Sequence, residues 1–349
     1  MPRKSPLSAK PHVPSPTTTT PTTSNAKRAV SSALSRSPSL PNARTIPQPL
    51  RFPVLVLASL ALSSLFYSLA APYTGGELAS VSRSLNSWWE VGGLVGWRAV
   101  ELSIGWWLEY DGIDLASLTL LSHLPTLYLL STFYGVSSPT IIISLTIDIL
   151  TTSLPFRLFR PLSPAHHAST SPTVPNRSII ADTPLSLTTT LLATAIYAIT
   201  LYTSLTTFLP THLVTYFTGL RSLSAAYAPA LPVLVLNLLP AGYAAREYLF
   251  TATAGFAQSA SKPRASSPFN PATASLRETL AWNVWGYAPR SKFLLKRTAT
   301  LMLVTGLNTW VHTYVTVDGV ESAGAAGWSG VWVVAAGLTG GVFWWVGDV

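Results

Sequence analysis

The chain returns repeatedly to uncharged apolar runs of about twenty residues, the length that an α-helix needs to cross a bilayer. The clearest is Phe52–Ala71 (FPVLVLASLALSSLFYSLAA), with Arg51 directly before it and Pro72 directly after it. Only 10% of the 349 residues are charged, against roughly 25% in soluble domains. The predicted fold class is therefore all-α, a polytopic integral membrane helical bundle.

Two regions are expected from the distribution of apolar and polar residues. Residues 1–51 contain eight Lys or Arg, no acid and long Ser/Thr/Pro-rich runs, which predicts a disordered basic tail. Residues 52–349 form the multi-pass domain. Its eight predicted spans lie near residues 52–71, 91–109, 115–135, 139–155, 184–209, 229–256, 298–317 and 327–346. Six or seven spans are the alternative.

The segment Val91–Glu109 decides on which side every later loop lies. Arg98 and Glu101 stand near its middle at a spacing of i, i+3, where they can partly neutralise each other. Each costs about 2.5–3.5 kcal/mol on insertion scales before pairing. If the segment crosses, the loops at 156–183 and 257–297 share the side of the tail, and 18 of the 22 basic residues lie there. Because Lys and Arg are enriched on the inner side, both termini are expected inside.

Ionisable and strongly polar groups inside predicted spans form the candidate functional site, since such groups are expensive in a bilayer. Arg98 and Glu101 make either a structural ion pair or part of a transport or catalytic site. Asp148 is either a proton or cation site or a helix–helix contact. The histidines and the amide can hydrogen-bond between helices or line a proton path. The complete candidate intramembrane site is Arg98, Glu101, His123, Asp148, Asn308 and His312.

One apolar segment is expected to be interrupted. Pro240 lies inside the predicted span 229–256 and is the candidate helix break, as in the discontinuous helices of transporters. Arg246 and Glu247 follow it and could instead cap the inner edge of a kinked helix. Because they are adjacent in an α-helix, they are expected to point about 100° apart and not to pair with each other.

The polar loops suggest contacts with lipid rather than a bound cofactor. The candidate contacts with anionic lipid headgroups are Arg290, Lys292, Lys296 and Arg297. His166 and His167 have no Asp or Glu near them in sequence until Asp182, so no metal site is expected there. The chain has no cysteine, which excludes disulfides and thiolate chemistry. We find no nucleotide-binding or hydrolase motif and expect no cofactor.

Three function classes remain open. The first is a non-catalytic membrane organising or assembly factor, the second is a transporter or channel-like protein, and the third is a membrane-embedded enzyme. The net charge of +9 follows from membrane orientation, so no nucleic-acid partner is expected. The expected location is the endomembrane system (endoplasmic reticulum, vacuole or Golgi) or the plasma membrane. The mitochondrial inner membrane is the alternative, because residues 25–36 form a basic amphipathic segment like an import signal.

Overall fold

The structure is a computed structural model that describes residues 47–167, 174, 176–256, 275–277, 279 and 289–347. The chain divides into two units, Met1–Thr45 and Ile46–Val349, and the described residues all belong to the second. The predicted tail up to residue 46, the import-like segment at 25–36 and most of the loop at 257–297 therefore lie outside the described residues.

Every regular element in the described ranges is a helix, which confirms the all-α prediction. The long helices are α2 (Gln48–Ala79), α3 (Trp88–Trp107), α4 (Gly112–Phe133), α5 (Ser138–Phe159), α7 (Thr183–Thr206), α10 (Leu231–Ala245), α13 (Pro289–Thr316) and α14 (Ser322–Gly347). The short ones are η2 (Pro164–His167), α6 (Arg177–Ala181), α8 (Leu209–Tyr216), α9 (Ser224–Tyr227), the π-helix η3 (Arg246–Thr251) and α11 (Ala252–Ala254).

Five helices, α2, α4, α5, α7 and α14, are long and apolar enough to cross a membrane. Each of the eight predicted spans coincides with a helix, but α10 has only 15 residues, and α3 and α13 carry charged or strongly polar side chains. The α2 helix begins at Gln48, within the segment predicted as the tail, because the Pro at its start suits a first helical turn.

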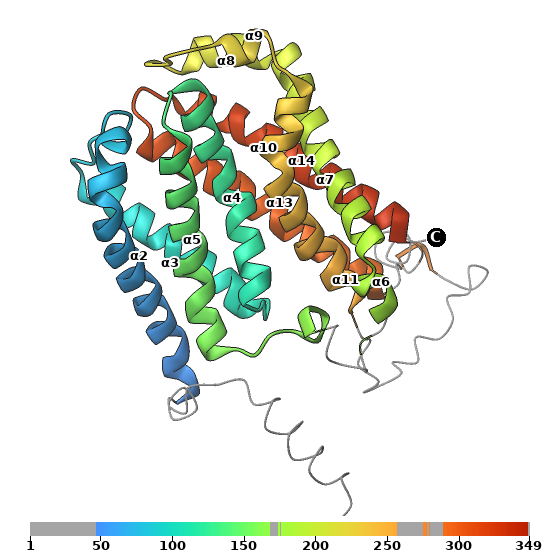
Figure 1. Cartoon of the computed structure of the whole chain (residues 1–349). Coiled ribbons are helices and arrows are strands. Elements are labelled where there is room, and N and C mark those ends of the chain that lie inside the picture. The colour runs from blue at the N-terminus through green and yellow to red at the C-terminus, as the bar shows by residue number, and fades with distance from the viewer. Residues whose placement is uncertain are drawn as a thin grey trace, which may run out of the picture. The chain divides into compact units, whose positions relative to one another are not determined.

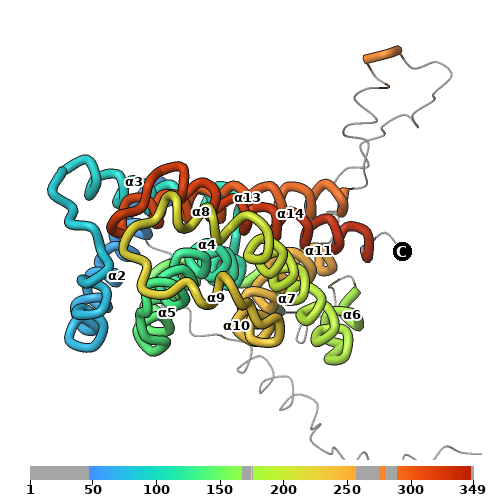
Figure 2. The backbone as a smooth tube through the Cα atoms, turned by 90° about the horizontal axis from the view of Figure 1, so that it is seen from above, coloured from blue at the N-terminus to red at the C-terminus, as the bar shows by residue number. Residues whose placement is uncertain are grey.

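The helices form two layers. In Figure 1, α2, α5, α4, α10 and α7 stand side by side, and Figure 2 views them nearly end-on, while α13 and α14 run lengthwise across one face. Of the two crossing helices, α13 packs on α4 and α14 packs on α7. The α4 helix is the best enclosed, with 83% of its most apolar stretch buried against 17% for α2.

Hydrogen bonds between side chains and backbone fasten the second layer to α4. Pro125 lies inside α4 and provides no backbone N–H donor. Around it, the Asn308 side chain donates to the carbonyl of Ser122 (3.0 Å), and Trp328 Nε1 donates to the carbonyl of Pro125 (3.1 Å). Carbonyls near a helix-interior proline thus accept donors from α13 and α14.

One end of the bundle, named the basic end, holds the start of α2 and the described residues at 108–111, 160–167 and 176–182. Phe52 packs against Trp106 with ring centroids 5.9 Å apart, and Arg160 Nη2 donates to the carbonyl of Trp106 (2.7 Å). Asn176 Nδ2 donates to the carbonyl of Ala254 (3.3 Å). The start of α2 and the ends of α3, α5 and α11 are therefore neighbours.

The other end, named the acidic end, holds the connections at 80–87, 134–137, 207–230 and 317–321. The backbone N–H of Arg83 donates to Thr316 O (2.9 Å), and that of Asp318 donates to Val81 O (3.0 Å). The α3 helix starts beyond Arg83 and finishes at Trp107, so it runs from the acidic end to the basic end. This is the geometry that the charge distribution required of Val91–Glu109.

Candidate functional site

Five of the six candidate polar residues line one cavity of about 420 Å³. It lies among α2, α3, α4, α5 and α13. The lining polar residues from the sequence-based set are Arg98, Glu101, His123, Asp148 and His312. The structure thus brings together residues that are up to 214 positions apart in sequence. Whether they act as a functional site stays a prediction.

Arg98 and Glu101 pair as their helical spacing predicts. Arg98 Nη1 lies 3.4 Å from Glu101 Oε2 on the same face of α3. The second terminal nitrogen of Arg98 donates to Thr151 Oγ1 of α5 (2.9 Å). The guanidinium therefore ties α3 to α5 as well as neutralising its neighbour.

His123 lies between two carboxylates. Its Nδ1 is 3.1 Å from Asp148 Oδ2, and its Nε2 is 3.7 Å from Glu101 Oε1. Tyr67 of α2 donates its hydroxyl proton to Asp148 Oδ1 (2.9 Å). The ring of His312 lies beside His123, with centroids 5.1 Å apart. We name Tyr67, Arg98, Glu101, His123 and Asp148 the central polar cluster.

The central polar cluster can be electrically neutral. Arg98 and a protonated His123 balance the carboxylates of Glu101 and Asp148. Their side chains are only 8–15% exposed, and a buried ion is costly unless an opposite charge accompanies it. The arrangement can hold α2, α3, α4 and α5 together, and it can also pass a proton between an imidazole and a carboxylate.

Asn308 is the candidate residue that does not line this cavity. Its side-chain oxygen accepts from Trp97 Nε1 (2.7 Å), and its nitrogen donates to Ser122 O. Trp97 lines the cavity, so Asn308 holds a lining side chain in position without itself reaching the cavity. Sequence reasoning missed Tyr67, Trp97 and Thr151, because an aromatic or Thr in a span looks like an ordinary membrane residue.

The helix containing Pro240 differs from its prediction in two ways. The α10 helix continues through Pro240, and the change of winding occurs later, where the π-helix η3 begins at Arg246. Arg246 and Glu247 form an ion pair between Nη1 and Oε1, contrary to the expectation that they diverge. A π-helix turns less per residue than an α-helix, which brings adjacent side chains closer together.

The four basic residues predicted to contact headgroups have different surroundings. Lys296 is exposed, and Arg290 and Lys292 are half-buried. Arg297 is buried, with 4% of its side chain exposed, and forms an ion pair with Asp114. The prediction that Arg297 contacts lipid headgroups is therefore wrong, because its guanidinium is paired with Asp114 inside the bundle. The other three remain candidates for headgroup contact.

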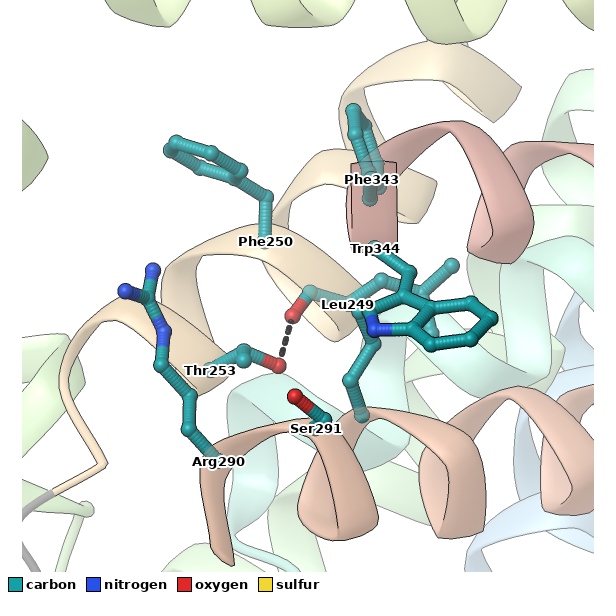
Figure 3. Close-up of a pocket in the computed structure, with 8 residues that line it drawn as sticks. Leu249, Phe250, Thr253, Arg290, Ser291, Phe343 and Trp344 are labelled. Carbon is teal, nitrogen blue, oxygen red and sulfur yellow. Dashed lines mark hydrogen bonds between the residues drawn. The ribbon is translucent and has the colours of Figure 1, made fainter. Parts of the chain in front are cut away.

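Arg290 borders a small cavity between η3, α13 and α14, which Figure 3 shows. Its volume of about 20 Å³ is close to the minimum for one water molecule. The Thr253 hydroxyl, which lines this cavity, donates a hydrogen bond to the carbonyl of Leu249 (2.6 Å). The cavity is too small to receive a ligand.

A second cluster of charges lies at the basic end. Asp111 caps α4, its Oδ1 accepting from the backbone of Ile113 (2.9 Å) and Asp114 (2.8 Å). Its Oδ2 accepts from the backbone of Ser163 (2.7 Å) and lies 2.6 Å from His166 Nδ1. His166 thus has two carboxylates beside it, although sequence reasoning found none nearby. They are Asp111, which precedes α4, and Asp114 in the first turn of α4 (3.9 Å from His166 Nε2), 55 and 52 positions away in sequence.

The Asp111–His166 contact shifts both pKa values, and both groups lie outside the spans. Burial alone opposes ionisation of Asp111, but the hydrogen bond and charge of His166 hold the pKa of the carboxyl well below its usual range. Burial likewise disfavours the imidazolium, yet Asp111 and then Asp114 raise the pKa of His166 above its usual value. Both groups therefore favour their charged forms.

Asp111, Asp114 and His166 place oxygen and nitrogen atoms within 4.8 Å of one another, close enough to share a metal ion. The surrounding charges fit that role poorly. Arg297 pairs with Asp114 and stacks over the rings of Tyr110 and Tyr248, with its guanidinium carbon 4.8 and 4.3 Å from their centroids. A guanidinium at this position would repel a metal cation.

Residues 182–346 match the model of a protein family described as the bouquet formation protein 3 C-terminal domain. The match covers just under half of the chain. No curated protein and no solved structure matched the chain. The matched segment begins at the start of α7 and includes Asn308 and His312, whereas the charged residues of the central polar cluster precede it.

Proposed function

We propose that this chain is a non-catalytic membrane protein that organises or anchors other components at its membrane. The central polar cluster is the observation that carries the proposal, since its charged groups pair across α3, α4 and α5 and Tyr67 of α2 donates a hydrogen bond to it. Such pairing suits a permanent structural lock. The similarity of residues 182–346 to a family named for bouquet formation supports the same class of role.

We further propose that all eight long helical segments cross the membrane, with the basic end on the inner side. The positive-inside tendency supports this orientation, because the start of α2 and the described residues Arg160 and Arg297, which border the two basic loops, lie at one end. The family name suggests the nuclear envelope, which fits the endomembrane location expected from the sequence. The mitochondrial inner membrane is the alternative location.

The first test is the position of a tagged full-length copy in cells that lack the protein. We expect a nuclear rim and an amino terminus that is retained. A mitochondrial pattern with loss of the first ~40 residues, as import-signal removal produces, would contradict the proposed membrane.

The second test separates organisation from chemistry. We expect a variant in which Arg98, Glu101, His123 and Asp148 are all replaced by neutral residues of similar size to restore the phenotype of those cells. Deletion of residues 258–274, in the basic loop, is expected not to restore it. The opposite result would show that the polar residues carry the activity and the loop does not.

The cavity of about 420 Å³ beside His123 and Asp148 favours a second candidate, a transporter that moves protons or cations. The purified chain in sealed liposomes would then dissipate a pH gradient, and Asp148→Asn would abolish the flux. Under the organising role, wild type and variant leave the gradient equally intact. An enzyme using the same acid–base groups is the third possibility.

A further inference from the structure

A separate cavity of about 400 Å³ opens at the basic end, among α4, η2, α6, α7, α10 and η3. It shares no lining residue with the cavity of the central polar cluster. The polar residues on its wall that matter here are His166, Asp182, Ser186, Arg246, Glu247 and Thr251. Its size suits a small polar group rather than a single water molecule.

Three of the lining residues carry buried polar atoms that have no hydrogen-bond partner. These atoms are His166 Nε2, Arg246 Nε and Thr251 Oγ1. The side chains of His166 and Arg246 are 2% and 7% exposed, and Thr251 is 3% exposed. A buried polar atom without a partner is unfavourable, so three around one cavity indicate a ligand that supplies the missing partners.

The three atoms call for an acceptor. Arg246 can only donate, and the Thr251 hydroxyl can donate. His166 directs Nδ1 at the carboxylate of Asp111, and its Nε2 lies 3.9 Å from Asp114 Oδ1, too far for a hydrogen bond, so Nε2 can still donate. Three donors converging from η2 and η3 match the oxygens of a phosphate group, which accept charge-assisted hydrogen bonds.

The same wall also offers negative charge. Asp182 and Glu247 line the cavity, and Glu247 already pairs with Arg246. A purely anionic ligand would be repelled by these carboxylates, whereas an amine close to the phosphate would be attracted. The combination of donors and carboxylates therefore fits a zwitterionic group.

The π-helix gives this wall its shape. Arg246, Glu247 and Thr251 are all in η3, where the wider winding brings them to one cavity. Single π-helical turns within α-helices are frequent at functional sites. Arg297 Nε donates to the carbonyl of Tyr248 in the same element (2.6 Å), which fixes η3 against α13.

We propose that this cavity binds a phosphate group that carries an amine, as the headgroup of a zwitterionic phospholipid such as phosphatidylethanolamine does. The site lies where α7 begins and α10 ends, at the level expected for headgroups. This choice of a lipid source rests on the membrane location proposed above. A soluble phosphoethanolamine shares the chemistry, so the test separates the two sources. The three donor atoms are covered in this structure, so binding requires their side chains to rotate toward the cavity.

The experiment uses the purified full-length chain in detergent and measures the dissociation constant and the shift in unfolding temperature. The probes are dioctanoyl phosphatidylethanolamine, dioctanoyl phosphatidylglycerol, phosphoethanolamine and inorganic phosphate. We expect saturable binding of the first, with the unfolding temperature raised, and affinity at least about tenfold lower for the other three.

Two neighbouring threonines provide a matched pair of variants. Thr251→Val removes an unpartnered hydroxyl from the cavity wall and is expected to weaken lipid binding about threefold to tenfold. Thr253→Val removes a hydroxyl that already donates to Leu249 O, outside the cavity, and is expected to leave affinity unchanged. Arg246→Gln is expected to weaken binding by about tenfold or more, but it also leaves Glu247 without its partner.

Several outcomes would overturn the proposal. Equal affinity for phosphatidylglycerol would remove the amine from the recognised group, and equal affinity for phosphoethanolamine would make the ligand a soluble compound. If no probe binds, or Thr251→Val only raises the unfolding temperature with binding unchanged, the cavity is a packing defect. These binding results are independent of where a tagged copy is found in cells, so the two proposals can fail separately.

Discussion

At the scale of single residues, the charges of the central polar cluster depend on one another. Asp148 contacts both His123 and Tyr67 through different oxygens, so Asp148→Asn would remove the charge that pairs with His123 and leave one of the two donors facing an amide NH₂ group. Removing one partner of a buried ion pair typically costs about 3–5 kcal/mol. We therefore expect Asp148→Asn to lower the thermal unfolding temperature of the detergent-solubilised protein markedly.

The control for that substitution is Arg83→Gln. Arg83 lies 3.8 Å from Glu90 in a pair whose side chains are 41% and 27% exposed. Exposed pairs contribute about 0–1 kcal/mol, so little change is expected. An equal decrease in unfolding temperature for the two substitutions would show that the Asp148 side chain is exposed to solvent.

The His166–Asp111 contact predicts a pH dependence of stability. The pKa of His166 is raised in the folded chain, so its stabilisation is complete below the unfolded pKa of about 6.5 and is lost as pH rises through the folded value. The pKa of Asp111 is lowered, so its contribution is present above about pH 3.9 and is lost only under strongly acidic conditions.

The measurement compares wild type with His166→Asn by thermal unfolding between pH 5 and 9. We expect the difference in unfolding temperature to be largest near pH 5–6 and to shrink toward pH 9. Asp114 and Glu247 also face the imidazole and reinforce this direction. A difference that stays constant over the range would mean that folding does not shift the pKa of His166.

Residue spacing predicted local contacts better than distant ones. The i, i+3 rule places Arg98 beside Glu101, as found. His166 and Asp111 are 55 positions apart, and no local pattern links them. Arg246 and Glu247 were misjudged because the α-helical angle was assumed where the chain is π-helical.

At the scale of helices, α7 and α10 approach closely because α10 has a glycine at their contact. A Cβ added at Gly242 would lie 1.9 Å from Thr194 Oγ1 and 2.7 Å from the carbonyl of Thr190. We expect Gly242→Ala to separate the helices and destabilise the fold by about 1–3 kcal/mol, measured as a lower unfolding temperature.

Gly330→Ala is the matched control, because nothing lies within 4 Å of a Cβ at that position in α14. It should leave stability unchanged or slightly raise it, since Ala favours a helix over Gly. A comparable loss from both substitutions would argue against close packing at Gly242.

The lengths of the apolar segments predicted where the helices lie in the sequence. They did not predict how the helices are oriented relative to one another. Phe52–Ala71 falls within α2, and the alternation of basic and acidic loops required α3 to pass between the ends. The crossing of α13 and α14 over the other helices depends on side chains such as Asn308 and Trp328, which bond to α4. The prediction of a helix break at Pro240 was wrong, because a helix in a bilayer can continue past a proline when neighbouring helices pack against it.

At the scale of the whole molecule, the two ends are expected on opposite sides of the membrane. The native chain has no cysteine, so single-cysteine variants need no prior substitutions. In sealed vesicles, an impermeant thiol reagent should label Lys296→Cys from one side and Asp318→Cys from the other. Both positions are exposed. Labelling of both from the same side would contradict the crossing of α13.

The asymmetry of charge was the most informative whole-chain signal, since it requires an even number of crossings before each basic loop. The described residues that border the two basic loops do lie at one end of the bundle, while the number of crossings stays a prediction. The charge pattern contained no information on cavities. Those depend on which side chains of α2, α5 and η3 happen to face inward. Tyr67 and Thr251 show this, because neither stands out from other span residues in the sequence.

The backbone pairing at the acidic end constrains the order in which the molecule can be assembled. The residues after α2 are held by the turn between the last two helices, through Ser82 and Val317 and the adjacent hydrogen bonds. During synthesis, α2 can pack on α5 as soon as α5 has formed, whereas the connection that follows α2 can complete its backbone pairing only after residues 316–318 have been made.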